Sequence, residues 1–189
     1  MRKLILAIAL ALFGFVANAQ TTAVKFPAID ASPLDVAYYP ANAAKVKKDD
    51  ESMPIIKVLY SRPAKKGREV FGVLEQFDKV WRLGANESTE VYFDRAVTIG
   101  DKKLKAGKYS LFAIPSKDKW TIIVNKQTDR WGAFTYNETK DVVRVAVPVT
   151  KLEKAIESFS IVFIDAPEGA NMVMAWDTTQ VMLPIGFKK

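Results

Sequence analysis

"SFSIVFIDAPEGANMVMAWD", residues 158–177, predicts two β-strands joined by a turn. Both ends of this stretch are apolar and rich in β-branched or aromatic residues, whereas its middle, "DAPEGAN", has the Pro, Gly and Asn that are typical of turns. The same rhythm continues outward along the chain. Strand-like segments recur at a spacing of about ten residues, as in antiparallel sandwiches and barrels; they include "WTIIVN", "DVVRVAVPV" and "QVMLPI".

Further strand signals precede these segments. "IIKVLYS" places Ile56, Val58 and Tyr60 on one face, and "EVYFDRAVTIG" predicts another strand. "IGDKKLKAGKYSLFAIP" predicts two short hairpins, with turns at Gly100-Asp101 and at Gly107.

Long amphipathic helices are missing from the pattern, although "KLEKAIE", residues 151–157, suggests one or two helical turns. We therefore predict an all-β fold, an antiparallel β-sandwich that is jelly-roll-like or immunoglobulin-like. Alternation alone does not decide whether the sheet closes, so a barrel is the alternative.

The N-terminus has the layout of a cleaved secretory signal. Arg2 and Lys3 precede an apolar run over residues 4–16, and small residues stand at Ala17 and Ala19. The run is shorter than the roughly twenty residues that span a bilayer. We expect residues 1–19 to be removed, the protein to be exported to the periplasm, outer envelope or extracellular space, and no transmembrane segment to remain.

Two regions follow the expected signal. Residues 20–53 are rich in Pro, Ala and Asp without a sustained period, which predicts an extended N-terminal arm. Residues 54–189 carry the strand signals and are predicted to form the single β-sandwich domain.

The amino-acid composition limits the kinds of catalytic and metal-binding site that the chain can form. The chain has no cysteine and no histidine, which excludes disulfides, thiol nucleophiles, histidine bases and nearly all zinc, copper or haem ligation. We expect no metal and no cofactor, and any catalysis would depend on Asp, Glu, Lys, Tyr or Ser.

The charge gives a weaker indication. The net charge of +7 becomes +5 without Arg2 and Lys3, which leaves 26 basic and 21 acidic residues. A solvated basic surface or an anionic partner is consistent with this excess, but nucleic acid is not expected because lysines alternate with acids, as in "KVKKDDE".

The link between two predicted strands, "YSRPAKKGREVFGVLEQFDKVWRLGANESTEVYF", is unusually dense in specific chemistry. Its arginines either form an anion site or pair with the local acids Glu69, Glu75, Glu87 and Glu90. Trp81 is either a plate for a sugar ring, with help from Trp131 or Tyr136, or a plug over the core. The candidate ligand-binding residues are Arg62, Arg68, Trp81, Arg82, Asn86 and Glu87.

This link, together with "SPLDVAYYP", "KLKAGKYSLFAIP", "WTIIVNK" and "WGAFTYNETKDVVRVAVP", resembles the bacterial exported family catalogued as domain-of-unknown-function family 2911. The resemblance covers the chain from Ser32 to the "LPIG" near its C-terminus. Phe77-Asp78 and Ser88 depart from the family pattern, in which we expect Tyr-Gly and Ala. The resemblance implies export in bacteria of the Bacteroidetes type and a compact β-rich domain, but no catalytic residues.

Three functions fit these observations. The favoured one is a small exported module that binds a glycan or an anionic ligand through the six candidate residues. The second is a structural or protein-interaction domain of the envelope, which uses a sheet edge or the arm. The third is a glycoside hydrolase-like enzyme in which Glu87 acts with Glu90, Glu138 or Asp129. The sequence carries no hydrolase signature, so a binding protein is preferred to an enzyme.

Overall fold

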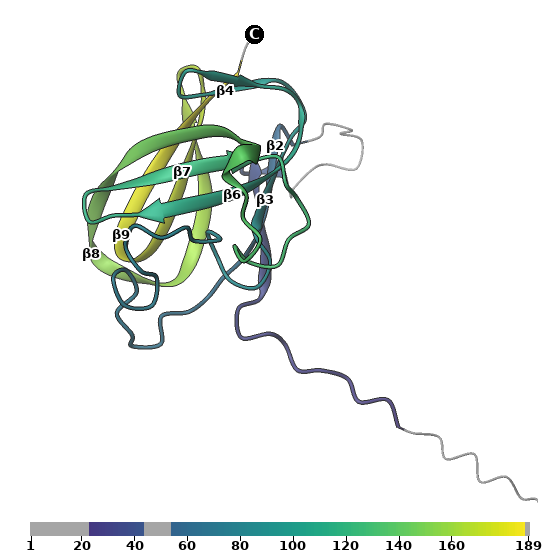
Figure 1. Cartoon of the computed structure of the whole chain (residues 1–189), viewed down its shortest axis with the longest axis vertical. Coiled ribbons are helices and arrows are strands. Elements are labelled where there is room, and N and C mark those ends of the chain that lie inside the picture. Colours follow the sequence, from purple (N-terminus) through teal and green to yellow (C-terminus); the bar gives the residue numbers. More distant parts are fainter. Residues whose placement is uncertain (1–22, 44–53, 188–189) are drawn as a thin grey trace, which may run out of the picture.

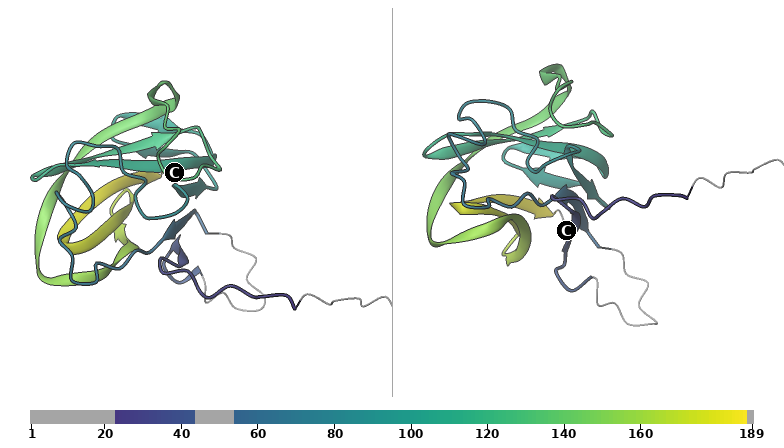
Figure 2. Two further views of the ribbon diagram at one scale, coloured as in Figure 1. Left: turned by 60° about the horizontal axis from the view of Figure 1, so that its bottom comes forward. Right: turned by 90° about the horizontal axis from the view of Figure 1, so that it is seen from below.

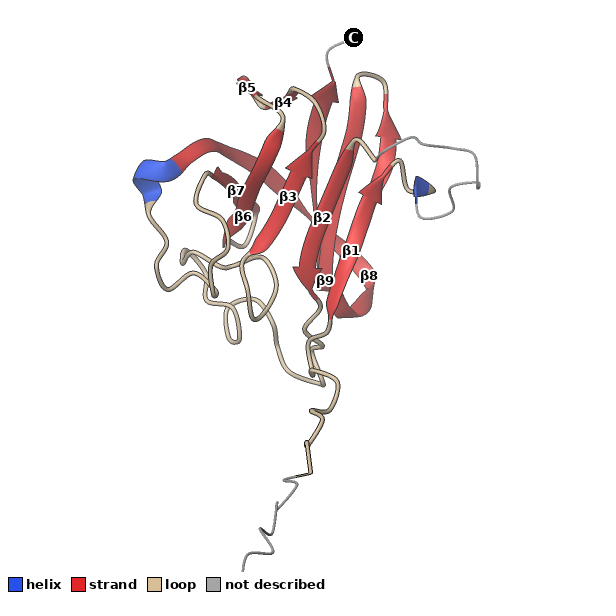
Figure 3. Cartoon of the chain, turned by 90° about the vertical axis from the view of Figure 1, so that its right-hand side faces the viewer, coloured by secondary structure: helices blue, strands red, loops and turns tan. Residues whose placement is uncertain are grey.

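The computed structural model describes residues 23–43 and 54–187, and in them it confirms the all-β prediction (Figures 1 and 3). The strands form one open antiparallel sheet in the order β1-β2-β3-β6-β7-β8-β9-β4-β5. A short 3₁₀ turn, η2 (Glu138–Lys140), precedes β8. The strands are β1 (Leu34–Tyr39), β2 (Ile56–Ser61), β3 (Thr89–Phe93), β4 (Val97–Ile99), β5 (Lys102–Leu104), β6 (Gly107–Pro115), β7 (Lys119–Asn125), β8 (Asp141–Ala166) and β9 (Gly169–Phe187).

The open sheet folds over on itself (Figure 2). β8 begins beside β7 and then continues beside β9 into a second layer, which lies opposite β2, β3, β6 and β7. Alternating side chains meet between these layers in one core. In β2 these side chains are Ile56, Val58 and Tyr60, the three residues predicted to share a face. The Tyr60 ring lies 5.7 Å from the ring of Phe159 on β8, and this contact joins the two layers. The architecture is therefore sandwich-like, although its sheet is continuous.

The largest departure from the predicted strands is the length of β8 and β9. The predicted strand that ends at Asp177 and the predicted strand "QVMLPI" are one strand, β9, in which Asp177 takes a left-handed backbone (φ +52°). The helical turns expected over residues 151–157 are also wrong, because this segment lies within β8. Lys151 and Ile156 pair with Thr179 and Asp177 of β9. Tertiary pairing here overrides local helix propensity. The β8–β9 register shifts twice in this part, between Lys151 and Ile156 and between Ile156 and Ser160.

One of the two expected hairpins is confirmed. β4 and β5 pair across the turn at Gly100-Asp101, and Gly100 has a positive φ of 58°. The second hairpin, at Gly107, is wrong because β6 pairs with β3 and β7 instead of β5. The predicted strand over "EVYFDRAVTIG" is likewise two strands, β3 and β4, which pair with different neighbours.

Part of the expected arm belongs to the sheet. β1 pairs antiparallel with β2 along its whole length, from Leu34 opposite Ser61 to Tyr39 opposite Ile56. Residues 23–29 extend away from the domain (Figure 1), whereas Asp30 and Pro33 accept hydrogen bonds from Asn86 and Arg62 of the link. The predicted signal, residues 1–19, lies outside the described residues, as do positions 44–53 of the arm. Within the described residues, no helix has the length and apolar character needed to cross a membrane.

Candidate functional site

The tryptophan of the dense link is a core residue. Trp81 is 4% exposed, and its backbone is held by β6, since its N–H donates to the Ala113 carbonyl at 2.7 Å. Its ring packs in a cluster of aromatic side chains, namely Phe71, Trp120, Phe159 and Trp176. The position agrees with the core plug of the sequence analysis, and the ring face is not open to a sugar.

The turn after Trp81 depends on glycine. The Trp81 indole Nε1–H donates to the Gly84 carbonyl at 3.0 Å, and Gly84 has a φ of +154°. A Cβ at Gly84 would lie only 2.9 Å from the Ser61 carbonyl oxygen. The predicted tight turn at Gly84 is thus present, and both its backbone angle and its surroundings exclude a side chain.

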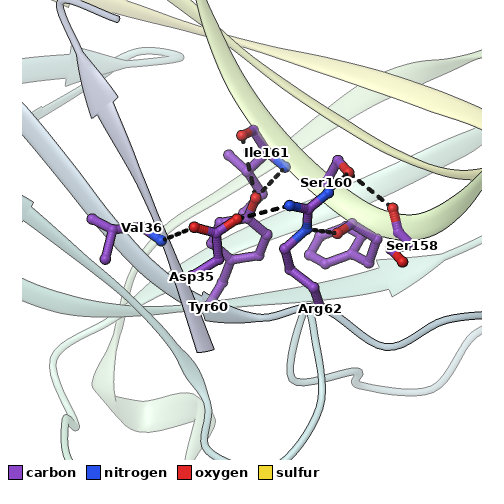
Figure 4. Close-up of polar contacts among 8 residues, drawn as sticks. Asp35, Val36, Tyr60, Arg62, Ser158, Ser160 and Ile161 are labelled. Atoms are coloured by element: carbon purple, nitrogen blue, oxygen red, sulfur yellow. Dashed lines mark hydrogen bonds and ion pairs between the residues drawn. The ribbon is translucent and has the colours of Figure 1, made fainter. Parts of the chain in front are cut away.

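Arg62 joins the edge strand β1 to β8 in the opposite layer (Figure 4). Its guanidinium donates to the Asp35 carboxylate at 2.8 Å, to the Ser160 hydroxyl at 2.8 Å and to the Phe159 carbonyl at 3.1 Å. Asp35 belongs to β1, whereas Ser160 and Phe159 belong to β8. A fork of fixed donors suits this three-way contact, which connects an edge strand to the opposite layer.

The other two arginines of the link have separate partners. Arg68 donates to the carbonyls of Lys65 at 2.8 Å and Ala64 at 2.6 Å, which fixes the turn just before it. Arg82 donates to the Asn86 carbonyl at 3.0 Å. The pairing acids suggested from the sequence are therefore wrong for these contacts: Arg62 uses Asp35, and the other two use backbone carbonyls. The three guanidinium groups each serve a different local contact.

A groove of about 400 Å³ lies beside the link, on the outer face of the sheet. We call it the Trp131 groove. It includes Glu87 from the predicted ligand-binding residues and three residues suggested from the sequence as helpers or acids, namely Glu90, Asp129 and Trp131. Its lining residues are Leu34, Leu59, Tyr60, Ser61, Glu87, Ser88, Glu90, Asp129, Arg130 and Trp131.

The end of the link anchors the loop that carries Trp131. Glu87 and Trp131 form an isolated antiparallel bridge. The Ser88 backbone N–H donates to the Arg130 carbonyl at 2.9 Å, and the Ser88 hydroxyl reaches the same oxygen at 3.3 Å. An alanine at this position would lack the second contact. The loop is therefore held at the rim of the groove by backbone pairing.

A lysine bridges two of the groove carboxylates. The Lys108 ammonium lies 2.8 Å from Glu90 Oε2 and 2.7 Å from Asp129 Oδ1. The Asp129 backbone N–H donates to Glu90 Oε1 at 2.7 Å. The hydrogen bond from Lys108 lowers the pKa of Asp129, and its bonds to Asp129 and Glu90 raise the pKa of Lys108. These contacts hold the Glu90 and Asp129 carboxylates next to each other at the groove.

Trp131 is the exposed aromatic of this site, with 60% of its surface accessible. The next residue, Gly132, has a φ of +63°, and a Cβ there would lie 3.0 Å from the Arg82 guanidinium carbon. Arg82 in turn lies over the Phe134 ring, 5.3 Å from its centroid. Arg82 of the link thus supports the Trp131 loop from beneath. Arg82 does not line the groove itself. It helps to position the Trp131 loop, which forms part of the groove wall.

Two further candidates play supporting parts. Asn86 has a left-handed backbone (φ +56°), and its Nδ2 donates to Asp30 at 3.0 Å. Tyr136 donates to Asp141 at 2.6 Å and packs on Phe112, with 5.1 Å between ring centroids. Burial is the main cause that raises the pKa of Tyr136. Both residues stabilise the chain around the groove without lining it.

The carboxylates proposed for catalysis separate into two groups. Glu87, Glu90 and Asp129 line the Trp131 groove, whereas Glu138 lies in η2 and does not. A general acid needs a raised pKa. Burial raises the pKa of Glu75 to about 7, but Glu75 does not line the groove. The three groove carboxylates can accept hydrogen bonds when they are ionised.

Lys108 and Arg130 were not among the residues predicted for the site. Arg130 directly precedes Trp131 in the sequence. Its position next to a candidate aromatic residue could therefore have predicted that it lies at the site. Lys108 could not be found this way, because it meets Glu90 only through the pairing of β3 with β6, in which Tyr92 is opposite Lys108. Strand register is a tertiary property that the local sequence does not contain.

A larger cleft, of about 1210 Å³, lies near the turn between β8 and β9. Its walls are mainly apolar, with Ala146, Pro148, Met182 and Pro184 among them. Among the described residues that line it, Glu168 is the one that carries a charge. Binding sites orient their ligands through a few convergent polar groups, so we prefer the Trp131 groove as the candidate site.

Comparison with protein families matches residues 41–185 to the family described as "Protein of unknown function (DUF2911)". The match covers the link, the Trp131 loop and the strands that carry both. Comparison with curated proteins and with solved structures gives no match.

Proposed function

The chain belongs to the DUF2911 family, and from the groove described above we propose that it is an exported carbohydrate-binding protein. The observation that carries this proposal is the exposed Trp131 ring beside three carboxylates in one groove. An indole ring offers a flat apolar face, and carboxylates accept hydrogen bonds from hydroxyl groups. Sugars present an apolar ring face and hydroxyls at its edge, which is the complement of this arrangement.

Preorganisation supports the proposal. The Trp131 loop is tied to the link by backbone pairing, and Lys108 holds Glu90 and Asp129 in place. A site whose groups are fixed before binding loses less conformational entropy when a ligand arrives. A mere surface aromatic would not need these supports.

A glycan is favoured over an anionic ligand. The cationic groups needed for an anion are used elsewhere: Arg62 contacts Asp35, Arg68 contacts backbone carbonyls, and Arg82 contacts Asn86. The groove is lined by three carboxylates, Glu87, Glu90 and Asp129. The cations are fewer, since Arg130 lines the groove and Lys108 pairs with two of the carboxylates from beside it. An anion would meet repulsion there, whereas uncharged hydroxyls would donate to these oxygens.

The test is binding of soluble oligosaccharides to residues 20–189, measured by calorimetry, with glucose-, N-acetylglucosamine- and galacturonate-based series as probes. We expect a neutral oligosaccharide to bind the wild type, Trp131→Ala to abolish binding, and Trp131→Phe to retain part of it. The matched control is Val162→Ala, which removes an exposed apolar side chain on β8 and should leave binding unchanged. Equal binding by wild type and Trp131→Ala would contradict the proposal.

Hydrolysis is distinguished in the same samples. Reducing ends are measured over the incubation, and a binding protein leaves the oligosaccharide intact. Release of reducing ends that is lost in Glu87→Gln would instead support the glycoside hydrolase alternative.

The envelope interaction alternative has one specific observation in its favour. In the extended segment before β1, Val24, Phe26 and Ile29 are 76%, 83% and 90% exposed. Apolar side chains at this exposure are suited to a protein partner. Deletion of residues 23–29 would abolish such an interaction but should not affect oligosaccharide binding in the groove.

Export is part of the proposal and rests on the sequence of residues 1–19. Expression of the full chain in a bacterial host should give a mature protein that begins at Gln20. Mass spectrometry of the periplasmic and extracellular fractions measures this directly, and an uncleaved chain retained in the cytoplasm would contradict it.

A further inference from the structure

A row of four side chains crosses the outer face of the sheet next to the Trp131 groove. The strand register places Tyr38 opposite Lys57, Lys57 opposite Tyr92, and Tyr92 opposite Lys108. The neighbouring residues on each strand, such as Ala37, Val58 and Val91, point into the core. Because successive side chains of a strand alternate between faces, the four members of the row share the outer face.

This row is continuous with the groove. On β2 and β3 the next residues on the same face are Leu59 and Glu90, which are opposite each other and both line the groove. Neighbouring strands lie about 4.8 Å apart, so the row spans roughly 14 Å from β1 to β6. Together, the groove and the row form a platform much longer than a single sugar unit.

The chemistry of the row is also suited to a sugar chain. Aromatic and ammonium side chains alternate along it, so that apolar ring faces lie between hydrogen-bond donors. Tyr92 is 45% exposed, and Lys108 is fixed by Glu90 and Asp129. The row adds aromatic surface and donors to the acceptors that the groove supplies.

We propose that the ligand is an extended polysaccharide, whose chain occupies the groove at Trp131 and continues across the sheet face over Tyr92 toward Tyr38. This inference rests on the proposed carbohydrate binding. It adds that the protein recognises an internal stretch of a long chain. A site for a single sugar unit or a disaccharide would need the groove alone, and the row would then be an ordinary solvated face of the sheet.

The experiment measures affinity against oligosaccharide length, from disaccharide to hexasaccharide, by calorimetry on residues 20–189. The probes are the neutral glucose and N-acetylglucosamine series. In the wild type we expect the dissociation constant to fall at least about tenfold along the series, because each added unit reaches more of the platform. In Tyr92→Ala we expect the disaccharide affinity to stay within about twofold of wild type, and the gain with length to disappear.

Control variants separate the row from general surface effects. Lys57→Ala should reduce the gain with length, whereas Lys103→Ala, an exposed lysine on β5 away from the row, should leave it unchanged. If the wild type binds disaccharide and hexasaccharide equally, the extended-chain inference is overturned and carbohydrate binding stands. If neither probe series binds at any length, the proposed function itself fails.

Discussion

Two tryptophans of this protein lie in similar local sequences but differ in burial. Trp81 occurs in "WRLGAN" and Trp131 in "RWGAF", yet Trp81 is 4% exposed and Trp131 is 60% exposed. The backbone of Trp81 pairs with Ala113 on a central strand, which places its ring over the core. The backbone of Trp131 pairs with Glu87 at the rim of the groove. The segment with which the backbone pairs decides whether the tryptophan ring packs in the core or stays exposed.

The two loops that contain these tryptophans have different roles. The link that contains Trp81 is chemically dense because its arginines and its glycine turn hold the fold, and because Arg82 supports the second loop. The loop that contains Trp131 carries the surface that is open to a ligand. The predictions below separate these roles by stability on one side and binding on the other.

The largest effect is expected from Trp81→Ala. Removal of a buried indole from the aromatic cluster leaves a cavity, and large-to-small changes of this kind cost about 3–5 kcal/mol of unfolding free energy. Urea denaturation followed by circular dichroism measures the loss. Trp81→Phe is the control and should restore a large part of the stability. A loss from Trp81→Ala below about 1 kcal/mol would mean that the link does not close the core.

Carboxyl groups in the two regions respond to pH in opposite directions. Burial raises the pKa of Glu75 in the link to about 7, whereas Lys108 lowers the pKa of Asp129 at the groove. For Glu75, the unfolded chain loses its proton near its ordinary pKa while the folded chain retains it. The stabilising effect of the protonated form is therefore complete below about pH 4.5 and is lost as the pH rises to about 7.

Glu75→Gln tests this difference. The amide cannot ionise, so the variant should be more stable than wild type at pH 8 by at most about 3 kcal/mol, and the advantage should vanish at pH 4. The chain has no histidine, so no imidazole titrates in this window. Urea midpoints for both proteins across this pH range provide the measurement, and parallel curves would show that Glu75 is not buried in the folded state.

Arg62→Ala should have a smaller effect on the same scale. The guanidinium contacts Asp35, Ser160 and the Phe159 carbonyl, but the side chain is 37% exposed and its ion pair is partly screened by water. We expect a loss of about 1–2 kcal/mol. Arg62→Lys keeps the charge and removes the fork, so it should recover only part of this loss. Full recovery by lysine would show that charge alone holds β1 to β8.

The sequence predicted the fold class better than the individual elements. Alternation in segments such as "IIKVLYS" was sufficient because one face of each strand is buried. The lengths of β8 and β9 could not be read in this way, since a strand that bends at Asp177 has the same local turn signals as two strands. The register that unites Tyr38, Lys57, Tyr92 and Lys108 is likewise absent from any local pattern.

The candidate site was predicted only in part, because its residues also come together through tertiary structure. Glu87 lines the groove and Trp131 was suspected as a helper, but Trp81 was the first choice for the sugar plate. The local sequence predicts that a tryptophan lies in a loop. Whether its ring is buried depends on the segment against which that loop packs. Arg82 and Ser88 illustrate a further gap, because they act on the site through the loop they support.

The smallest effect on stability, and the sharpest contrast with Trp81, is expected from Trp131→Ala. Its ring is mostly exposed, so the unfolding free energy should change by less than about 0.5 kcal/mol. The same variant should lose oligosaccharide binding, because the ring face is the apolar surface that the groove offers. Calorimetry measures the binding affinity and urea denaturation measures the unfolding free energy, both on one preparation of the variant. A large loss of stability would make Trp131 a second structural tryptophan, and the comparison between the two loops would no longer separate fold from function.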